Sequence, residues 1–86
     1  MAKLTKKEKA WLGKVQKVLK ECPSKRIGFY TIGDNSVHAF DCTMMDEIGE
    51  CMDRNEATDF GPAAIKVDAD FDEYLWFPNP VESTAG

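Results

Sequence analysis

Apolar side chains recur at helical spacing near the start of the chain. Thr5 followed by Glu8 has the spacing of a capping box, and Pro23 cannot continue a helix. Between these signals the apolar positions share an arc of about 120° at 100° per residue, and lysines occupy the opposite side. The apolar positions are Trp11, Leu12, Val15, Val18, Leu19 and Cys22. The pattern predicts an amphipathic helix over residues 5–21.

Two runs of aromatic and β-branched residues, 27–32 and 37–42, flank a cluster of turn-forming residues. This arrangement predicts a β-hairpin, and with Asp34-Asn35 as its turn Thr31 pairs with His38. Because side chains alternate along a strand, the register sorts them into two faces. One face, expected to be the core side, carries Ile27, Phe29, Phe40 and Cys42. The other carries Tyr30, Ile32, Val37 and Ala39, which is more apolar than a solvated face requires.

The second half of the chain combines a helical stripe with an alternating segment. The stripe is formed by Met44, Met45, Ile48, Cys51 and Met52, and it predicts a helix over residues 44–53. Residues 54–62 have the composition of a loop, and residues 63–71 alternate between apolar and polar as a strand does. Residues 74–77 form a last apolar segment before Pro78. We expect that segment to be extended, and it is a candidate fourth strand.

These elements and the length of 86 residues predict a single domain over residues 1–80. The order α-β-β-α-β, with the fourth strand left open, favours a small two-layer α+β fold. Its antiparallel sheet would have three to four strands, with two helices packed on one face. A compact chain of this length has a radius of gyration of roughly 12 Å. Residues 81–86 are expected to be a disordered tail.

Charge is strongly segregated along the chain. Residues 1–26 contain nine Lys or Arg and two Glu, a net charge of +7. Residues 27–86 contain two basic and thirteen acidic residues, a net charge of −11. A total of −4 therefore hides a basic N-terminal helix joined to an acidic body, and such asymmetry indicates an interaction surface.

The N-terminal segment and the cysteines favour a cytoplasmic location. Lysines return at positions 14, 17 and 20, which leaves no apolar stretch for a secretory signal. Cys22, Cys42 and Cys51 are odd in number and widely spaced, as expected of reduced thiols. No apolar run approaches the ~20 residues that span a bilayer. We therefore expect no membrane partner.

Catalytic, cofactor and metal signatures are weak. The triplet Asp68, Asp70 and Asp72 resembles a calcium loop but lacks its glycine and its final glutamate. A small enzyme using His38, Cys42 and Asp41 is an alternative, but His38 and Cys42 would lie roughly 13 Å apart along one strand. We expect no catalytic residues, no cofactor and no metal.

Two charged surfaces and one apolar surface are the candidate binding sites. The basic helix face includes Lys6, Lys7, Lys14 and Lys17, and it is either solvated or docked on an acidic protein surface. The acidic surface comprises Asp46, Glu47, Glu50, Asp53, Asp68, Asp70 and Asp72. The apolar surface comprises Tyr30, Ile32, Val37 and Trp76, because aromatic residues are enriched at interface cores.

The leading hypothesis is a non-enzymatic protein-binding or regulatory domain that acts through protein–protein contacts, including those of a homodimer. The alternative is an acidic DNA mimic that inhibits a nucleic-acid-binding protein, since patterned carboxylates can imitate phosphates. Direct nucleic acid binding by this chain is not expected, because an acidic body repels phosphate.

Overall fold

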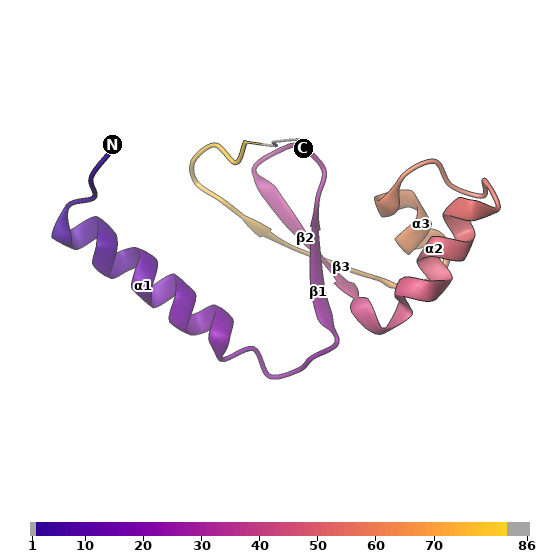
Figure 1. The fold of residues 1–86 in the computed structure, drawn as a ribbon, viewed down its shortest axis with the longest axis horizontal. Coiled ribbons are helices and arrows are strands. Elements are labelled where there is room, and N and C mark those ends of the chain that lie inside the picture. Colours follow the sequence, from indigo (N-terminus) through magenta and orange to yellow (C-terminus); the bar gives the residue numbers. More distant parts are fainter. Residues whose placement is uncertain (1, 83–86) are drawn as a thin grey trace.

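Three antiparallel strands form the centre of the computed structural model, which describes residues 2–82 (Figure 1). The elements follow in the order α1 (Lys6–Lys20), β1 (Ile27–Thr31), β2 (Ser36–Asp41), the 3-10 turn η1 (Cys42–Met44), α2 (Met45–Asp53), α3 (Phe60–Lys66) and β3 (Asp70–Trp76). The strand order in the sheet is β1-β2-β3. The predicted α+β class and the order α-β-β-α-β are confirmed. The described chain has three α-helices, however, where the sequence predicted two.

Helix α1 begins as its sequence predicts. The Thr5 side chain accepts a hydrogen bond from the Glu8 backbone N–H at 3.1 Å, and the Glu8 carboxylate accepts one from the Thr5 N–H at 2.8 Å. This reciprocal capping box satisfies two N–H groups that a helix start otherwise leaves unpaired. The helix ends at Lys20, three residues before Pro23.

The hairpin register differs from the predicted one by one residue. Tyr30 pairs with His38 and Thr31 with Val37, so five residues lie between the paired Thr31 and Val37, whereas the predicted pairing of Thr31 with His38 would leave six. The Asp34 carboxylate accepts a hydrogen bond from the Ser36 backbone N–H at 2.8 Å, and Gly33 has a φ of 86°. This turn, which is centred on Asp34 rather than on the Asp34-Asn35 pair, fixes the shifted register. A one-residue shift moves every side chain of one strand to the other face, so the predicted faces are wrong.

In the alternating segment 63–71, residues 63–66 are helix and only residues 70–71 are strand, which contradicts the predicted strand. The Asp59 side chain accepts from the Phe60 N–H at 2.8 Å and caps α3, and Pro62 occupies the first turn, where its missing N–H costs nothing. The helix ends at Lys66. Asp68 follows its C-cap with a φ of 62°, and the Ala69 N–H donates to the Ala64 carbonyl at 2.8 Å. The third strand therefore begins at Asp70 and includes residues 74–76, so there is no fourth strand among residues 2–82.

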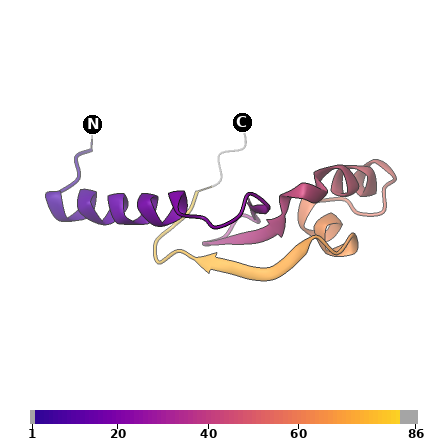
Figure 2. The same ribbon diagram turned by 90° about the horizontal axis from the view of Figure 1, so that it is seen from below.

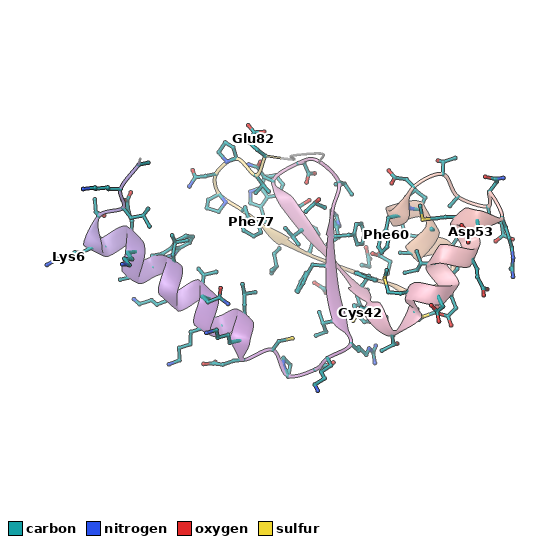
Figure 3. The ribbon with its side chains drawn as sticks, in the orientation of Figure 1. Lys6, Cys42, Asp53, Phe60, Phe77 and Glu82 are labelled. Carbon is teal, nitrogen blue, oxygen red and sulfur yellow. The ribbon has the colours of Figure 1, made fainter. Side chains whose placement is uncertain are left out.

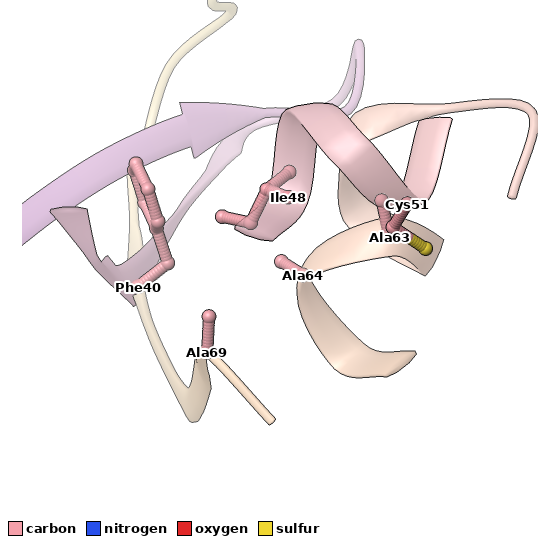
Figure 4. Close-up of a cluster of buried hydrophobic side chains, with 6 residues drawn as sticks. All are labelled: Phe40, Ile48, Cys51, Ala63, Ala64 and Ala69. Atoms are coloured by element: carbon pink, nitrogen blue, oxygen red, sulfur yellow. The ribbon is translucent and has the colours of Figure 1, made fainter. Parts of the chain in front are cut away.

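The hydrophobic core lies at one end of the sheet (Figure 4). Helices α2 and α3 cross there, and small side chains on α3 let the two helices approach closely. Phe40 from β2 closes the cluster on the sheet side. The buried residues are Phe40, Ile48, Cys51, Ala63, Ala64 and Ala69. The predicted stripe of α2 is thus the core stripe, although Met45 remains 49% exposed.

Helix α1 does not join this core. It lies beyond one end of the sheet while α2 and α3 lie beyond the other (Figure 2). The radius of gyration is 15.7 Å and the extents are 49 × 29 × 20 Å. This is larger than the roughly 12 Å of a compact chain. The predicted packing of the N-terminal helix beside a second helix on one sheet face is not confirmed: α2 and α3 pack together against Phe40, and α1 lies beyond the other end of the sheet.

The predicted disordered tail falls partly on described residues. The Val81 N–H donates to the Asn35 side chain at 3.4 Å, and Val81 is half-buried. Residues 83–86 lie outside the described residues.

Gly28 offers a test of this packing. A Cβ at Gly28 would lie 2.8 Å from the Cys42 Cβ and 2.8 Å from the Phe40 ring, whereas a Cβ at Gly49 meets nothing within 4 Å. We expect Gly28→Ala to destabilise the domain by about 1–3 kcal/mol through overpacking. Gly49→Ala, in the interior of α2, should stabilise it by up to about 1 kcal/mol. Urea unfolding of both variants measures this, and an unchanged midpoint for Gly28→Ala would contradict the packing.

Candidate functional site

The face of the sheet opposite α2 and α3 is apolar, and no helix of the described chain packs on it. The register places Phe29 beside Ala39, and Val37 beside Leu75, on this face. We call it the open face and define it by its apolar members. These are Ile27, Phe29, Val37, Ala39, Phe71 and Leu75.

The apolar side chains of the open face are accessible to solvent to different degrees. Phe29 is 44% exposed and Leu75 is 48% exposed, while Val37 and Ala39 on the central strand are half-buried. A shallow depression of about 540 Å³ crosses the face. It is lined by Ser24, Arg26, Ile27, Ala39, Phe71 and Glu73. A contiguous apolar patch with a groove in it is typical of an interaction surface.

Arg26 borders the depression and is held from two sides. Its guanidinium lies 4.9 Å from the centre of the Phe71 ring, and its Nε lies 3.6 Å from the Asp41 carboxylate. The Thr43 hydroxyl donates to the same carboxylate, and together with Arg26 it lowers the pKa of Asp41 below its ordinary value. The rim of the open face therefore carries a positive charge on Arg26 next to a negative charge on Asp41.

The opposite face carries a row of aromatic rings that joins the sheet to the helices. The Tyr30 ring lies 5.3 Å from the His38 ring and 5.3 Å from the Phe60 ring, and Phe60 projects from α3 toward the sheet (Figure 3). The Tyr30 hydroxyl donates to the Asp70 carboxylate at 2.9 Å. Burial, followed by this hydrogen bond and the charge of Asp70, raises the pKa of Tyr30 to about 12.

This raised pKa gives a pH prediction. The folded state holds the Tyr30 proton more tightly than the unfolded state, so stability is complete below the ordinary tyrosine pKa of about 10 and falls as pH rises toward 12. In a Tyr74→Phe background, the phenolate absorbance reports Tyr30 alone and should have its midpoint near 12. Adding Asp70→Asn should lower that midpoint. A titration midpoint near the ordinary tyrosine pKa in the Tyr74→Phe chain would contradict the burial of Tyr30 and its hydrogen bond to Asp70.

The hairpin turn brings Asp34, Ser36 and His38 together. The Ser36 hydroxyl donates to Asp34, and its oxygen lies 3.0 Å from His38 Nε2. These are the residue types of a hydrolase triad in a different order, because serine rather than histidine is the central member. Ser36 is only 3% exposed, so its oxygen is not accessible to a substrate. The cluster organises the turn.

Asp34 is the group in this turn that titrates in acid. Hydrogen bonds from the Ser36 hydroxyl and backbone N–H, with a smaller effect from His38, lower the pKa of Asp34. A lowered folded-state pKa contributes stability above the ordinary pKa, and that stability is lost as pH falls through the folded value. Asp34→Ala should therefore destabilise the domain at neutral pH and weaken the loss of stability in acid. Unfolding followed across pH tests this, with Asp53→Ala as an exposed control.

The predicted apolar binding residues do not share one face. Val37 belongs to the open face, whereas Tyr30 and Trp76 lie on the opposite face with His38 and Ser36, and Ile32 follows β1 in the turn. Tyr30 is packed against Phe60 and Phe40 rather than free for a partner. The grouping fails because it depended on the register that the Asp34 turn shifts.

The predicted charged surfaces have different outcomes. The lysines of the basic helix face, including Lys6, Lys7, Lys14 and Lys17, are all exposed, as are the four acidic residues of α2, Asp46, Glu47, Glu50 and Asp53. Asp70 accepts from Tyr30 and is half-buried. Asp68 and Asp72 adopt left-handed backbone conformations at a helix end and a strand irregularity. The three predicted strand carboxylates therefore do not form one face.

The residues of the enzyme alternative are separated. Asp41 pairs with Ile27 and so lies on the open face, whereas His38 lies on the opposite face. The Cys42 thiol donates to the Lys25 carbonyl at 3.2 Å. Among residues 2–82, no group of three or more His, Cys, Asp or Glu side chains is arranged to hold a metal ion.

Phe71 and Leu75 belong to the open face, and neither is among the predicted binding residues. Ile27 and Phe29, which were predicted to face the core, also belong to the open face. The missing signals are the Asp34 turn and the irregularity at Asp72, where β3 carries extra residues between Asp70 and Glu73. An aspartate followed two residues later by serine is a turn signal that could have indicated a turn centred on Asp34.

Comparisons with protein-family models, with curated proteins and with solved structures found no match. No helix in the described part of the chain has the length and apolar character needed to cross a membrane.

Proposed function

We propose that this chain is a small, non-enzymatic protein-binding domain, and that the open face is its binding surface. The observation that carries the proposal is the exposure of Phe29 and Leu75 on a face whose central residues, Val37 and Ala39, are also apolar. Burying such a face in a partner releases about 25 cal/mol per Å² of apolar area, before the costs of association.

The surroundings of the face support recognition rather than catalysis. Arg26, Asp41 and Glu73 place charges around the apolar centre, which is the usual anatomy of a protein interface. A cytoplasmic location is part of the proposal, and the free thiols of Cys22, Cys42 and Cys51 agree with it. The acidic DNA mimic stays a prediction. Its strand carboxylates are dispersed, so no observation favours it over the open face.

Site-specific photo-crosslinking in cells tests the proposal. A benzoylphenylalanine at position 29 replaces an aromatic ring on the open face, and we expect it to form a defined crosslink to a protein. The same residue at position 65 is the control, because Ile65 is 63% exposed on α3, away from the sheet. A defined protein adduct at 29 and not at 65 supports the proposal. Equal labelling at both positions, or none at 29, would overturn it.

A further inference from the structure

Helix α1 has an apolar stripe that the described chain leaves largely exposed. We call Trp11, Leu12, Val15, Val18 and Leu19 the helix stripe. Trp11 is 54% exposed and Val18 is 68% exposed, and no residue of α1 is buried. An amphipathic helix normally gains its stability by packing this stripe on another element. The chain thus has two uncovered apolar surfaces, one on a helix and one on a sheet.

The two surfaces match in length. Helix α1 has 15 residues and is about 22 Å long at 1.5 Å per residue. Strand β3 has seven residues and is about 23 Å long. One helix can therefore cover the open face along its strands, which is how an α+β fold closes the exposed face of its sheet.

The two surfaces also match in charge. The segment 1–26 that contains α1 has a net charge of +7, and residues 27–86 have a net charge of −11. Lysines lie along the polar side of α1, and Glu73 lies in the wall of the depression on the open face. Opposite charges around an apolar contact favour the encounter and fix its orientation.

The exposed area indicates how large the missing contact is. The chain exposes 7262 Å², whereas a compact folded chain of 9.7 kDa exposes about 5100 Å². The excess is about 2100 Å² per chain. Two chains that bury this excess in each other form an interface of about 4000 Å², which is in the range of obligate homodimers.

The linker between α1 and β1 holds the helix away from its own sheet. The Arg26 N–H donates to the Ser24 hydroxyl at 3.0 Å, and the Cys22 thiol donates to the Ser24 carbonyl at 3.3 Å. Pro23 restricts the same segment, and Arg26 is held by Asp41. A short, constrained hinge that keeps an element from closing on its own chain favours exchange of that element between two chains.

We propose that the partner of the open face is α1 of a second copy of this chain. Each helix stripe packs on the other chain's open face, and the exchange is reciprocal, which gives a closed two-fold dimer. This inference rests on the proposed function, because it names the occupant of the same face.

Sedimentation velocity of the full chain at micromolar concentration tests the proposal. We expect a species of twice the 9.7 kDa chain mass. Val18→Asp places a carboxylate in the helix stripe and should raise the dimer dissociation constant by about 100-fold or more, the scale of a lost interface hot spot. Ala10→Asp is the matched control. It adds the same charge to the same helix, but on the polar side, and should leave the dimer intact.

Photo-crosslinking from position 12 in a mixture of isotope-labelled and unlabelled chains identifies the pairing. We expect crosslinked peptides that join α1 of one isotope to β1 or β3 of the other. Crosslinks within one chain only, in a monomeric protein, would show that α1 closes on its own sheet and would overturn the proposal. A dimer that resists Val18→Asp would also overturn it. A monomer that cosediments with phosphatidylserine vesicles would assign the helix stripe to a membrane surface instead.

These outcomes separate the inference from the proposed function. If position 29 crosslinks a different protein while the purified chain stays monomeric, the second copy is the wrong partner and the open face remains a binding surface. If position 29 crosslinks nothing, both fail.

Discussion

Replacing Phe40 with alanine is expected to destabilise the domain by about 3–5 kcal/mol. Phe40 is 5% exposed and is the residue of the sheet that belongs to the buried cluster of α2 and α3. Its ring lies 5.0 Å from the Phe60 ring and 5.9 Å from the Tyr30 ring, both edge-on. Alanine leaves a cavity where the sheet packs on the helices. Domains of this kind have only about 5–15 kcal/mol of stability in total.

Urea unfolding followed by circular dichroism measures this loss. Ile65→Ala is the control, because Ile65 is 63% exposed on α3 and alanine is a better helix former, so its effect should stay within about 0.5 kcal/mol. A Phe40→Ala chain with the wild-type midpoint would show that the helices do not depend on the sheet for their packing.

Replacing Phe29 with glutamate is expected to abolish association through the open face while the domain stays folded. Phe29 is 44% exposed in the free chain, so glutamate at this position remains solvated and costs little stability. In the complex the same carboxylate would be buried against apolar side chains without a partner, which costs several kcal/mol. The dissociation constant should therefore rise by about 100-fold or more.

Phe29→Glu is best compared with Ile65→Glu, which adds the same charge to an exposed apolar position outside the sheet. Sedimentation reports association, and circular dichroism reports the fold. Equal association of both variants would contradict the assignment of the open face. Loss of the fold in Phe29→Glu alone would show that Phe29 is a core residue.

Helices α1 and α2 could be predicted from the sequence because their signals, a capping box in one and an apolar stripe in each, are local. Thr5 and Glu8 make the capping box that their spacing indicates, and the stripe of α2 is the one that packs in the core. The class and the order of elements follow from these helices and from the hairpin composition. None of this required knowledge of contacts between distant residues.

The hairpin faces could not be predicted, because they depend on one residue of register. The side-chain period of a strand is two, so the choice between an Asp34-Asn35 turn and a turn centred on Asp34 decides which side chains share a face. The prediction of a strand over residues 63–71 is wrong for another reason. Its alternation is that of a strand, but the Asp59 cap and the Ala63-Ala64 contact with α2 make residues 60–66 a helix.

The position of α1 relative to the sheet could not be predicted from the sequence either. Its amphipathic pattern indicates that the stripe is buried somewhere, but the pattern does not specify which surface buries it. In the structure the stripe is exposed and the open face is exposed with it.

The central claim, that the open face is covered by a protein partner, is tested most directly by the solvent exposure of its methyl groups. In a methyl-labelled chain at micromolar concentration, and again in unlabelled cell extract, a soluble paramagnetic probe should relax the Val37 and Leu75 methyls much less than the Ile65 methyl. In Phe29→Glu the Val37 and Leu75 methyls should relax markedly faster than in the wild-type chain, to the extent that their exposure in the single chain allows. The contradicting result is that the Val37 and Leu75 methyls of the wild-type chain relax as fast as they do in Phe29→Glu, both in the purified sample and in extract. In that case no protein partner covers the open face.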